Sequence, residues 1–436
     1  MAFQSWMKFI APVALALAGL APSMPAAALE RAASAPATDE AKSVFDDARS
    51  RIYQIRTLTS DGDAQASSGS GFLVGEDGLI ATNWHVVAYS VLEPELYRLE
   101  VRRTDNTRLP AQVVAIDATN DLALIRVKGE KGVPFAIRQA PLEKGEKAFS
   151  IGNPQNVGFT VVEGTFNGIQ AQSIQGYFHF TGAINGGMSG GPGLTREGEV
   201  FGVNVARSSS GSSIGFLVPS DRLSALMRRA RPESPSSQAL LEEARQGMIL
   251  GQDKITANVL AENPGMRQIG RFRFPVQPEA TSHCAGSSSK EEDDGYATEL
   301  AYCMIDFSIT AGRKHQAAMM AAQYNVVRNL SLDAVRFTAR VSDLATKDKD
   351  DKGEKKVVKK YSCRTSYVQI KGGTARTTLC TRPYVKFEEL HDAHLRIVTV
   401  DSSEEALVGD LILYGFTQAN IKRLGRWYLE TLEWKR

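Results

Sequence analysis

Cysteine is scarce in this sequence and confined to one part of it. The 436-residue chain has 4 cysteines, and all of them lie late, at Cys284, Cys303, Cys363 and Cys380. The paired C-x-x-C spacing that is typical of zinc sites is missing, so we expect two disulfides and no bound metal. Disulfides persist in oxidising compartments, so this expectation depends on export of the chain.

An excess of charge of either sign is also missing. Lysine and arginine number 51 against 49 acidic residues, which leaves a net charge of +2. Nucleic-acid binding usually requires a strong basic surplus, so nucleic acid is not an expected partner. The lysine-rich segment at residues 346–360, "TKDKDDKGEKKVVKK", interleaves acids with its lysines. We expect it to be a solvated loop between strands.

The apolar run at the N-terminus is too short and too rich in proline to predict a stable membrane span. Residues 1–28 contain the apolar core "FIAPVALALAGLA", and Ala26 and Ala28 fit a small-x-small cleavage pattern. Pro22 and Pro25 make a spanning helix unfavourable. We therefore expect a signal peptide and a periplasmic or secreted protein with no membrane span after its removal. An uncleaved anchor is the alternative.

The character of the chain changes twice after this segment. Residues 29–43 are polar and rich in alanine, and we expect a flexible lead-in there. From 44 to 230, short runs such as "GLIATN" and "LALIRV" are separated by glycine turns, which is typical of an antiparallel β barrel or sandwich. "DRLSALMRRARPE" predicts a closing helix, and residues 231–238, "RPESPSSQ", have the composition of a linker.

Residues 239–436 show both helical and strand patterns and predict a separate α+β domain of unknown role. "QALLEEARQGMIL" and "TQANIKRLGRWYLETLEW" indicate helices, while "VRFTARVSDL", "SYVQI" and "LRIVTV" are candidate strands. Two strands about the turn in "KGGTAR" would bring the last two cysteines together, and the first two bracket a polar loop, "AGSSSKEEDDGYATE". We therefore expect Cys284 to pair with Cys303 and Cys363 with Cys380, although four cysteines allow three pairings.

The stretch "INGGMSGGPG", residues 184–193, places Ser189 among glycines. Glycine lets the backbone approach a ligand closely, so this serine is a candidate nucleophile. The pattern G-x-S-x-G also occurs in α/β-hydrolases, where a helix follows the serine and the acid and histidine come later in the chain. Here a strand pattern follows, and the later histidines lie beyond the expected linker. The α/β-hydrolase fold is therefore disfavoured.

The partners that a serine nucleophile needs are found upstream, in the order His, Asp, Ser. His85 follows the hairpin "SGSGFLVGEDGLIATN", and Asp121 directly precedes the apolar strand pattern "LALIRV". Each residue alone is ordinary: a half-buried histidine, a turn cap and a turn serine. His179, in "GYFHF", lies in an alternating strand pattern and is interpreted as structural.

Four blocks in the correct order resemble the trypsin-fold serine proteases, and most closely the HtrA (Deg) branch. They are "GSGFLVGEDGLIATNWHVV", "DATNDLALIRV", "AINGGMSGGP" and "SIGFLVPSDRL", and the resemblance covers roughly residues 45 to 230. It implies a mainly β chain, with a two-barrel trypsin-like serine protease domain before the α+β C-terminal domain. It also implies a serine endopeptidase that needs no cofactor.

The resemblance assigns a role to each matched residue. Ser189 would attack the scissile carbonyl, His85 would act as general base, and Asp121 would orient the imidazole. The N–H groups of Gly187 and Ser189 would form the oxyanion hole. Ala183, six residues before the serine, would form the floor of the primary specificity pocket, with Ile184 beside it.

Two departures from the family limit what the resemblance implies. Met188 stands where the family usually has Asn and trypsin has Asp, so activation by a newly cut N-terminus is not expected. No PDZ module is recognisable after residue 238, so peptide gating and family-style oligomerisation do not carry over.

Polypeptides, including unfolded or misfolded envelope proteins, are the expected substrates. The alternatives are a non-catalytic protease-like scaffold and an envelope binding protein, and the oligomeric state stays open.

Overall fold

The computed structural model covers the chain from residue 38 to residue 435 with short gaps. The signal peptide expected at residues 1–28 and the centre of the lysine-rich segment lie outside the described residues. The described ranges are 38–140, 142–154, 157–170, 174–207, 214–261, 265–277, 281–291, 294–305, 307–346 and 355–435.

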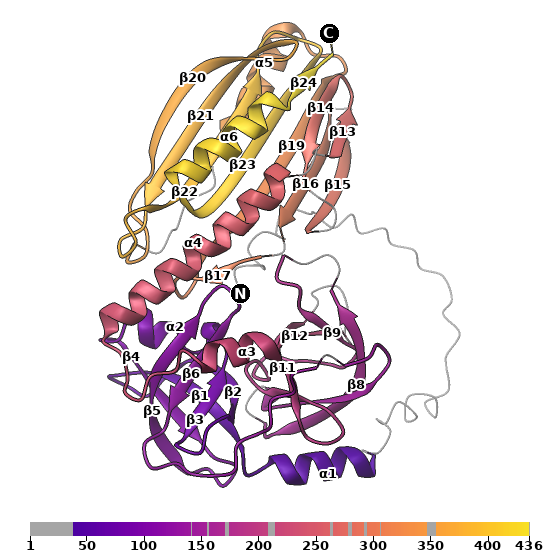
Figure 1. Ribbon diagram of the computed structural model, residues 1–436. Helices are drawn as coiled ribbons and strands as arrows, with labels where there is room; N and C mark the ends of the chain where they lie inside the picture. The colour runs from indigo at the N-terminus through magenta and orange to yellow at the C-terminus, as the bar shows by residue number, and fades with distance from the viewer. Residues whose placement is uncertain are drawn as a thin grey trace.

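Strands β1 to β12 form two closed six-stranded barrels (Figure 1), which confirms the predicted two-barrel, mainly β fold. The first barrel has the order β1-β2-β3-β6-β5-β4, and the second has the order β10-β11-β12-β9-β8-β7. The first six strands are Ile52–Thr59, Gln65–Leu73, Leu79–Thr82, Tyr97–Arg102, Arg108–Asp117 and Leu122–Arg126. The next six are Lys147–Gly152, Thr160–Ile169, Phe178–Phe180, Pro192–Leu194, Val200–Arg207 and Gly215–Pro219.

Three helices accompany the barrels: α1 (Asp39–Ala48), α2 (Trp84–Leu92) and α3 (Ser220–Met227). Helix α1 begins inside the segment that was expected to be a flexible lead-in, so that expectation is wrong for residues 39–43. The Thr38 hydroxyl caps α1 by accepting a hydrogen bond from the N–H of Ala41, and one apolar stripe of the helix is buried. The stripe orders the segment because it removes apolar surface from water.

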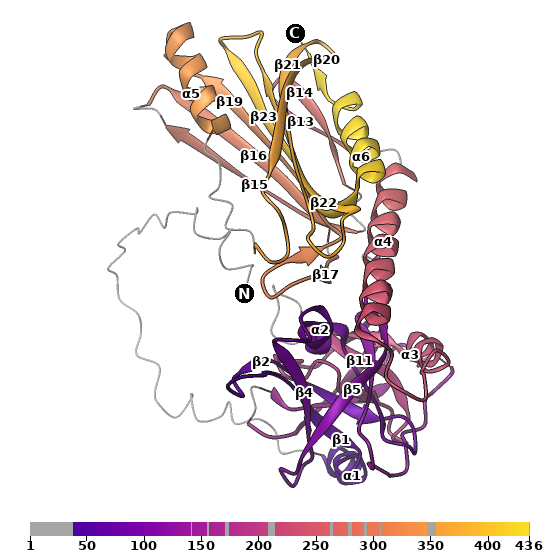
Figure 2. The same cartoon turned by 90° about the vertical axis from the view of Figure 1, so that its left-hand side faces the viewer.

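The C-terminal region begins with the long helix α4 (Ser237–Ala261), which runs from the first barrel along a seven-stranded antiparallel sheet (Figures 1 and 2). The sheet order is β15-β16-β19-β23-β22-β21-β20. Its strands, in chain order, are Ser282–Glu291, Tyr296–Ile305, Met319–Asn329, Ser362–Ile370, Gly373–Pro383, Leu390–Thr399 and Glu405–Thr417.

Smaller elements complete this region. A three-stranded sheet joins β13, β14 and β24, and a short hairpin joins β17 to β18. Helix α6, which was predicted to run to the end of the chain, ends at Glu430, and β24 follows it. The bounds are Gly265–Ile269 (β13), Phe272–Val276 (β14), Ile309–Thr310 (β17), Gln316–Ala317 (β18), Ala334–Thr346 (α5), Gln418–Glu430 (α6) and Glu433–Trp434 (β24).

The segment "VRFTARVSDL", a candidate strand, forms helix α5 instead, so that prediction is wrong. The buried side chains of α5 are Phe337, Val341 and Ala345, whose spacing of four residues follows one helical face. Asp333 precedes the helix and accepts hydrogen bonds from the N–H groups of Val335 and Arg336. This cap and the four-residue period outweigh the strand propensity of the valines, threonine and phenylalanine.

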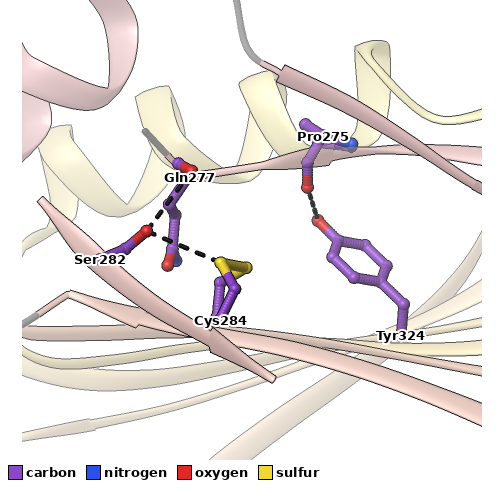
Figure 3. The surroundings of a disulfide bond; sticks show 6 residues. Pro275, Gln277, Ser282, Cys284 and Tyr324 are labelled. Carbon is purple, nitrogen blue, oxygen red and sulfur yellow. Dashed lines mark hydrogen bonds between the residues drawn. A yellow bond between two sulfur atoms is a disulfide. The ribbon is translucent and has the colours of Figure 1, made fainter. Parts of the chain in front are cut away.

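The stretch between Cys284 and Cys303 is a strand pair and not the polar loop that was expected. Strands β15 and β16 form a continuous antiparallel ladder in which these two cysteines lie opposite each other and are joined by a disulfide (Figure 3). The second disulfide joins Cys363 to Cys380 across β20 and β21, which completes the local pairing. Backbone pairing orders β15 although its side chains stay exposed, since an edge strand gains its hydrogen bonds from one neighbour.

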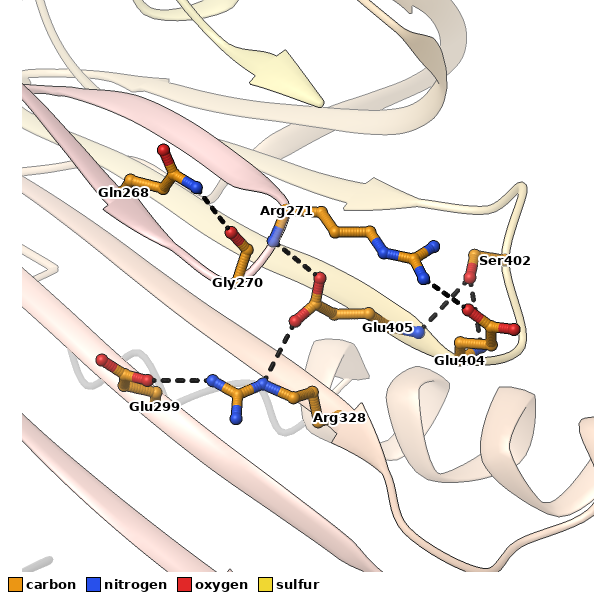
Figure 4. A network of polar contacts seen from close by, with 8 residues as sticks. All are labelled: Gln268, Gly270, Arg271, Glu299, Arg328, Ser402, Glu404 and Glu405. Carbon is orange, nitrogen blue, oxygen red and sulfur yellow. Dashed lines mark hydrogen bonds and ion pairs between the residues drawn. The ribbon is translucent and has the colours of Figure 1, made fainter. Parts of the chain in front are cut away.

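A buried carboxylate ties the small sheet to the large one. Glu405, at the start of β23, accepts hydrogen bonds from the backbone N–H of Arg271 and from the guanidinium of Arg328 (Figure 4). The turn at Gly270 lies so close that an added Cβ would sit 2.0 Å from a Glu405 oxygen. Glycine is therefore required where the turn after β13 approaches the carboxylate.

The first barrel and the C-terminal region share one hydrophobic core. The core includes Trp84 and Val91 of α2, Met248 of α4, Phe307 before β17 and Leu424 of α6. The C-terminal region is thus packed against the barrel and not merely tethered to it, and this contact lies at the helix that begins beside His85.

Candidate active site

His85 and Asp121 lie in contact at one end of the first barrel. His85 is the second residue of α2, and Asp121 immediately precedes β6. The His85 Nδ1 atom lies 2.6 Å from Asp121 Oδ2, and the His85 backbone N–H donates to Asp121 Oδ1 at 2.9 Å. The carboxylate therefore fixes both the ring and the main chain of the histidine.

The turn that carries Asp121 is held by its own neighbours. Asp121 has φ +55°, a left-handed conformation that Asp tolerates better than most residues. Asp117 accepts hydrogen bonds from Asn120, which closes the turn. The Asp121 carbonyl accepts from the Asn83 side chain at 2.8 Å and from the Trp84 N–H at 3.2 Å. These contacts direct the carboxylate toward α2.

The pair shifts the titration of the imidazole. Burial alone would lower the pKa of His85, but the negative charge and hydrogen bond of Asp121 outweigh it. The net effect raises the pKa of His85 above its ordinary value of 6.5. Asp121 thereby stabilises the protonated ring that forms when a base accepts a proton.

Ser189 lies in the turn before β10, in the second barrel. Its hydroxyl donates to the Val205 carbonyl at 3.4 Å, and within the described residues no hydrogen bond joins it to His85. Catalytic hydrogen bonds in unliganded enzymes are often open and tighten only when substrate binds. The structure thus brings His85 and Asp121 into contact, whereas the Ser189 hydroxyl is hydrogen-bonded within the second barrel.

The turn before Ser189 presents two unused N–H groups. Gly187 has φ +96°, a value that favours glycine. Among the described residues, no protein acceptor receives the N–H of Gly187 or of Ser189, whereas the N–H of Met188 donates to Asn185. Two free donors separated by one residue suit the stabilisation of a developing oxyanion.

Ser70 is a residue of this site that sequence reasoning missed. It lies on β2 in the first barrel, and its hydroxyl donates to the Gly187 carbonyl at 2.8 Å and accepts from the Asn153 N–H at 2.9 Å. Its own N–H donates to the Ser189 carbonyl at 2.7 Å. The signal lies in the sequence, because Ser70 is the serine of "GSGF", which belongs to the expected hairpin and opens the first block of the family resemblance.

The residues around the turn are largely buried. Met188, 1% exposed, belongs to an apolar cluster with Ile184 and Phe180, and its Cα and Cβ lie against Gly152. Ile184 also faces Gly215, where an added Cβ would meet its Cδ1 at 2.5 Å. Ala183 is partly exposed. The buried, apolar side chain of Met188 therefore anchors the turn. A charged side chain at this position would be buried and would need a partner of opposite charge.

Two further properties concern the described residues as a whole. They contain no group of three or more His, Cys, Asp or Glu side chains arranged to hold a metal ion. No helix among them is long and apolar enough to cross a membrane. His179 lies on β9, and its ring centroid is 6.3 Å from that of Phe216 on the neighbouring strand β12.

The part of the chain that contains the site is similar to known peptidases. Residues 69–203 match the trypsin-like peptidase domain. Serine protease HTRA1 of Xenopus laevis is 34% identical over 203 residues, covering 44% of this chain and 42% of that protein. The probable periplasmic serine endoprotease DegP-like of Rickettsia conorii is 31% identical over 220 residues, covering 45% of this chain and 42% of that protein.

Human serine protease HTRA3 is 35% identical over 167 residues, covering 36% of each chain. The chain thus spans less than half the length of these relatives. Residues 69–203 include His85, Asp121, Gly187 and Ser189, together with strands β3 to β10 of the two barrels. The chain therefore carries a trypsin-like peptidase domain whose homologues are HtrA and DegP serine proteases.

Proposed function

We propose that this protein is a serine endopeptidase that hydrolyses peptide bonds through an acyl-enzyme, with His85, Asp121 and Ser189 as its catalytic residues. The observation that carries the proposal is the 2.6 Å contact between His85 and Asp121 on the same site as a serine turn with two free N–H groups. A base, its orienting carboxylate, a nucleophile and an oxyanion hole are the parts that acyl transfer needs.

The chemistry follows from these groups. When substrate enters, the Ser189 hydroxyl leaves the Val205 carbonyl, transfers its proton to His85 and attacks the scissile carbonyl. The N–H groups of Gly187 and Ser189 bind the oxyanion that forms. Protonated His85, stabilised by Asp121, gives the proton to the leaving amine. Water then attacks the acyl-enzyme by the same route in reverse.

The substrates are polypeptides, and we propose unfolded or misfolded proteins of the cell envelope as the natural ones. Support comes from the two disulfides, which form in oxidising compartments, and from the homologue that is named as periplasmic. Export by the N-terminal segment is part of this proposal. Ala183, partly exposed and uncharged, supports a primary pocket for small or medium aliphatic side chains.

Labelling with a fluorophosphonate tests the proposal, because this reagent reacts only with an activated serine. The full-length protein should be labelled, and Ser189→Ala should not. Loss of the nucleophile of such a triad typically lowers kcat on the order of 10⁶-fold. Ser90→Ala is a suitable control, because the Ser90 hydroxyl donates only to the Val87 carbonyl within α2. A non-catalytic scaffold would show no labelling of the wild-type protein.

A further inference from the structure

The C-terminal region contacts the helix that carries His85. The fully buried indole of Trp84, the residue before His85, donates a hydrogen bond of 3.1 Å to the Thr310 carbonyl of β17. Further along α2, the Tyr89 hydroxyl donates to the Arg313 carbonyl, in the loop between β17 and β18, at 3.3 Å. Lys386 donates to the Leu92 carbonyl at the end of the helix. One face of α2 is therefore held by the C-terminal region from end to end.

The same region also contacts the turn that carries Asp121. The buried Thr119 hydroxyl donates to the Gly247 carbonyl of α4 at 2.8 Å. The helix approaches so closely that an added Cβ at Gly247 would lie 2.8 Å from the Ala118 Cβ. One turn earlier on α4, Glu243 accepts a hydrogen bond from the Ile116 N–H of β5 at 3.3 Å.

The two catalytic residues of the first barrel thus reside on different elements, α2 and the turn before β6, and the C-terminal region touches both. We infer that the C-terminal region is a built-in positioning element for catalysis, which acts through Trp84 and Thr119 to hold His85 and Asp121 in register. Neither residue touches the reacting atoms, so both are positioning residues.

The geometry makes this role consequential. The contact between His85 and Asp121 is short, and it depends on the relative placement of two segments that are 36 residues apart in the chain. Buried side chains have few alternative arrangements, so a support on both segments restricts their relative motion. A misplacement of about 1 Å can cost on the order of 100-fold in rate. The expected effect on kcat rests on the proposed function. The expected effect on the pKa of His85 does not depend on it.

The test uses the full-length protein and Thr119→Val, which removes the hydroxyl and preserves the shape of the side chain. The matched control is Thr256→Val, because the buried Thr256 hydroxyl also donates at 2.8 Å to a main-chain carbonyl, that of Gln252 within α4. Thr119→Ser keeps the hydrogen bond, and Trp84→Phe removes the other support.

Two quantities are measured for each variant: kcat with a peptide substrate, and the pKa of His85 from an NMR titration of its ring. We expect Thr119→Val and Trp84→Phe to lower kcat about 10-fold with little change in KM. This loss is smaller than the roughly 100-fold loss for a misplacement of about 1 Å, because each variant removes only one support. Their His85 pKa should fall toward 6.5, because a looser Asp121 raises it less. Thr119→Ser and Thr256→Val should match the wild type in both.

The inference is overturned if Thr119→Val and Trp84→Phe keep the wild-type His85 pKa, or if Thr256→Val changes it as much as they do. The titration needs no turnover. An inert wild-type protein would therefore refute the proposed function while the NMR result still decides the positioning role.

Discussion

The Ser70 hydroxyl of the first barrel donates a hydrogen bond of 2.8 Å to the Gly187 carbonyl of the second. This bond crosses between the barrels and fixes the peptide that follows Gly187. Since Ser70 also receives the Asn153 N–H, its hydroxyl has both a donor and an acceptor and cannot rotate freely. One side chain therefore restrains the turn that presents the oxyanion donors.

We expect Ser70→Ala to lower kcat with little change in KM. Removing an oxyanion donor itself costs on the order of 10²–10³ in kcat, and this substitution only loosens the turn, so a loss of about 10-fold is expected. Peptide aldehydes, whose tetrahedral adducts place an oxygen in the oxyanion hole, should bind more weakly to the variant. Steady-state kinetics and inhibition constants measure both effects.

Ser220→Ala provides the control for that measurement. The buried Ser220 hydroxyl also donates at 2.8 Å to a main-chain carbonyl, that of Arg138, which is not part of the serine turn. Equal losses of kcat in the two variants would contradict the positioning role of Ser70 and indicate general destabilisation.

Much of the first half of the chain was predictable because its signals are local. Alternating apolar runs with glycine turns predict the barrels, and Gly78, at positive φ, lies in the turn between β2 and β3 of the expected hairpin. The supports of the site were not predictable. The bonds from Ser70 to Gly187 and from Thr119 to Gly247 join residues that are 117 and 128 positions apart, and no local pattern specifies them.

The C-terminal region shows the same limit in another form. Tertiary contacts that local composition does not encode decide the structures of helix α5 and strand β15. The valines of α5 favour strands, but the helix buries Phe337 and Val341 against β19 and β23. The serines of β15 favour a loop, but β16 offers a complete row of backbone partners.

The pH dependence of kcat/KM should follow His85. A base must be neutral to accept a proton, and the Asp121 charge raises the pKa of His85 above 6.5. Activity should therefore rise through an acid limb whose midpoint lies above 6.5, and it should be low where the ring is protonated. Rates between pH 5 and 9 test this. A midpoint at or below the ordinary histidine value would contradict the inferred balance between burial and the Asp121 charge.

Asp121→Asn should change both the rate and the shape of that profile. Loss of the charge removes the contribution that raises the pKa of His85, so the acid limb should move to lower pH. The amide also favours the wrong tautomer, so kcat should fall on the order of 10⁴-fold. Asp105→Asn is the control, because it removes a carboxylate charge from an exposed turn of the same barrel and its Oδ1 can still accept the Thr107 N–H. An unchanged kcat in Asp121→Asn would remove Asp121 from the mechanism.

Cleavage should favour small or medium aliphatic residues before the scissile bond. Ala183 supplies no carboxylate at the expected pocket floor, and Ile184 is buried with Met188 beneath the turn. A lysine or arginine in such a pocket would lose its hydration without gaining an ionic partner. A peptide library profiled with the wild-type protein measures the preference. Cleavage dominated by Lys or Arg would show that another acid lines the pocket.

Removal of the disulfide between Cys363 and Cys380 should weaken the C-terminal sheet and leave the catalytic pair intact. In the described part of the chain, β20 is an edge strand that pairs only with β21. The disulfide closes a loop with a sequence separation of 17, and a loop of that size restricts the unfolded chain by roughly 3 kcal/mol. The double variant Cys363→Ala/Cys380→Ala should therefore unfold at lower temperature and keep the wild-type His85 pKa, as calorimetry and NMR would show.

Cys284→Ala/Cys303→Ala is the matched comparison, since its loop has a separation of 19 and lies across the other edge pair, β15 and β16. Because the two disulfides close loops of nearly equal length, each should lower the conformational entropy of the unfolded chain by nearly the same amount. Cys303 is 2% exposed, so the alanine variant there also loses buried contacts and should be the less stable of the two.

If neither double variant lowers the unfolding temperature, the disulfides do not stabilise the sheet. If the Cys363→Ala/Cys380→Ala variant instead shifts the His85 pKa, the far edge of the sheet is coupled to the site more tightly than the contacts of α2 and α4 imply.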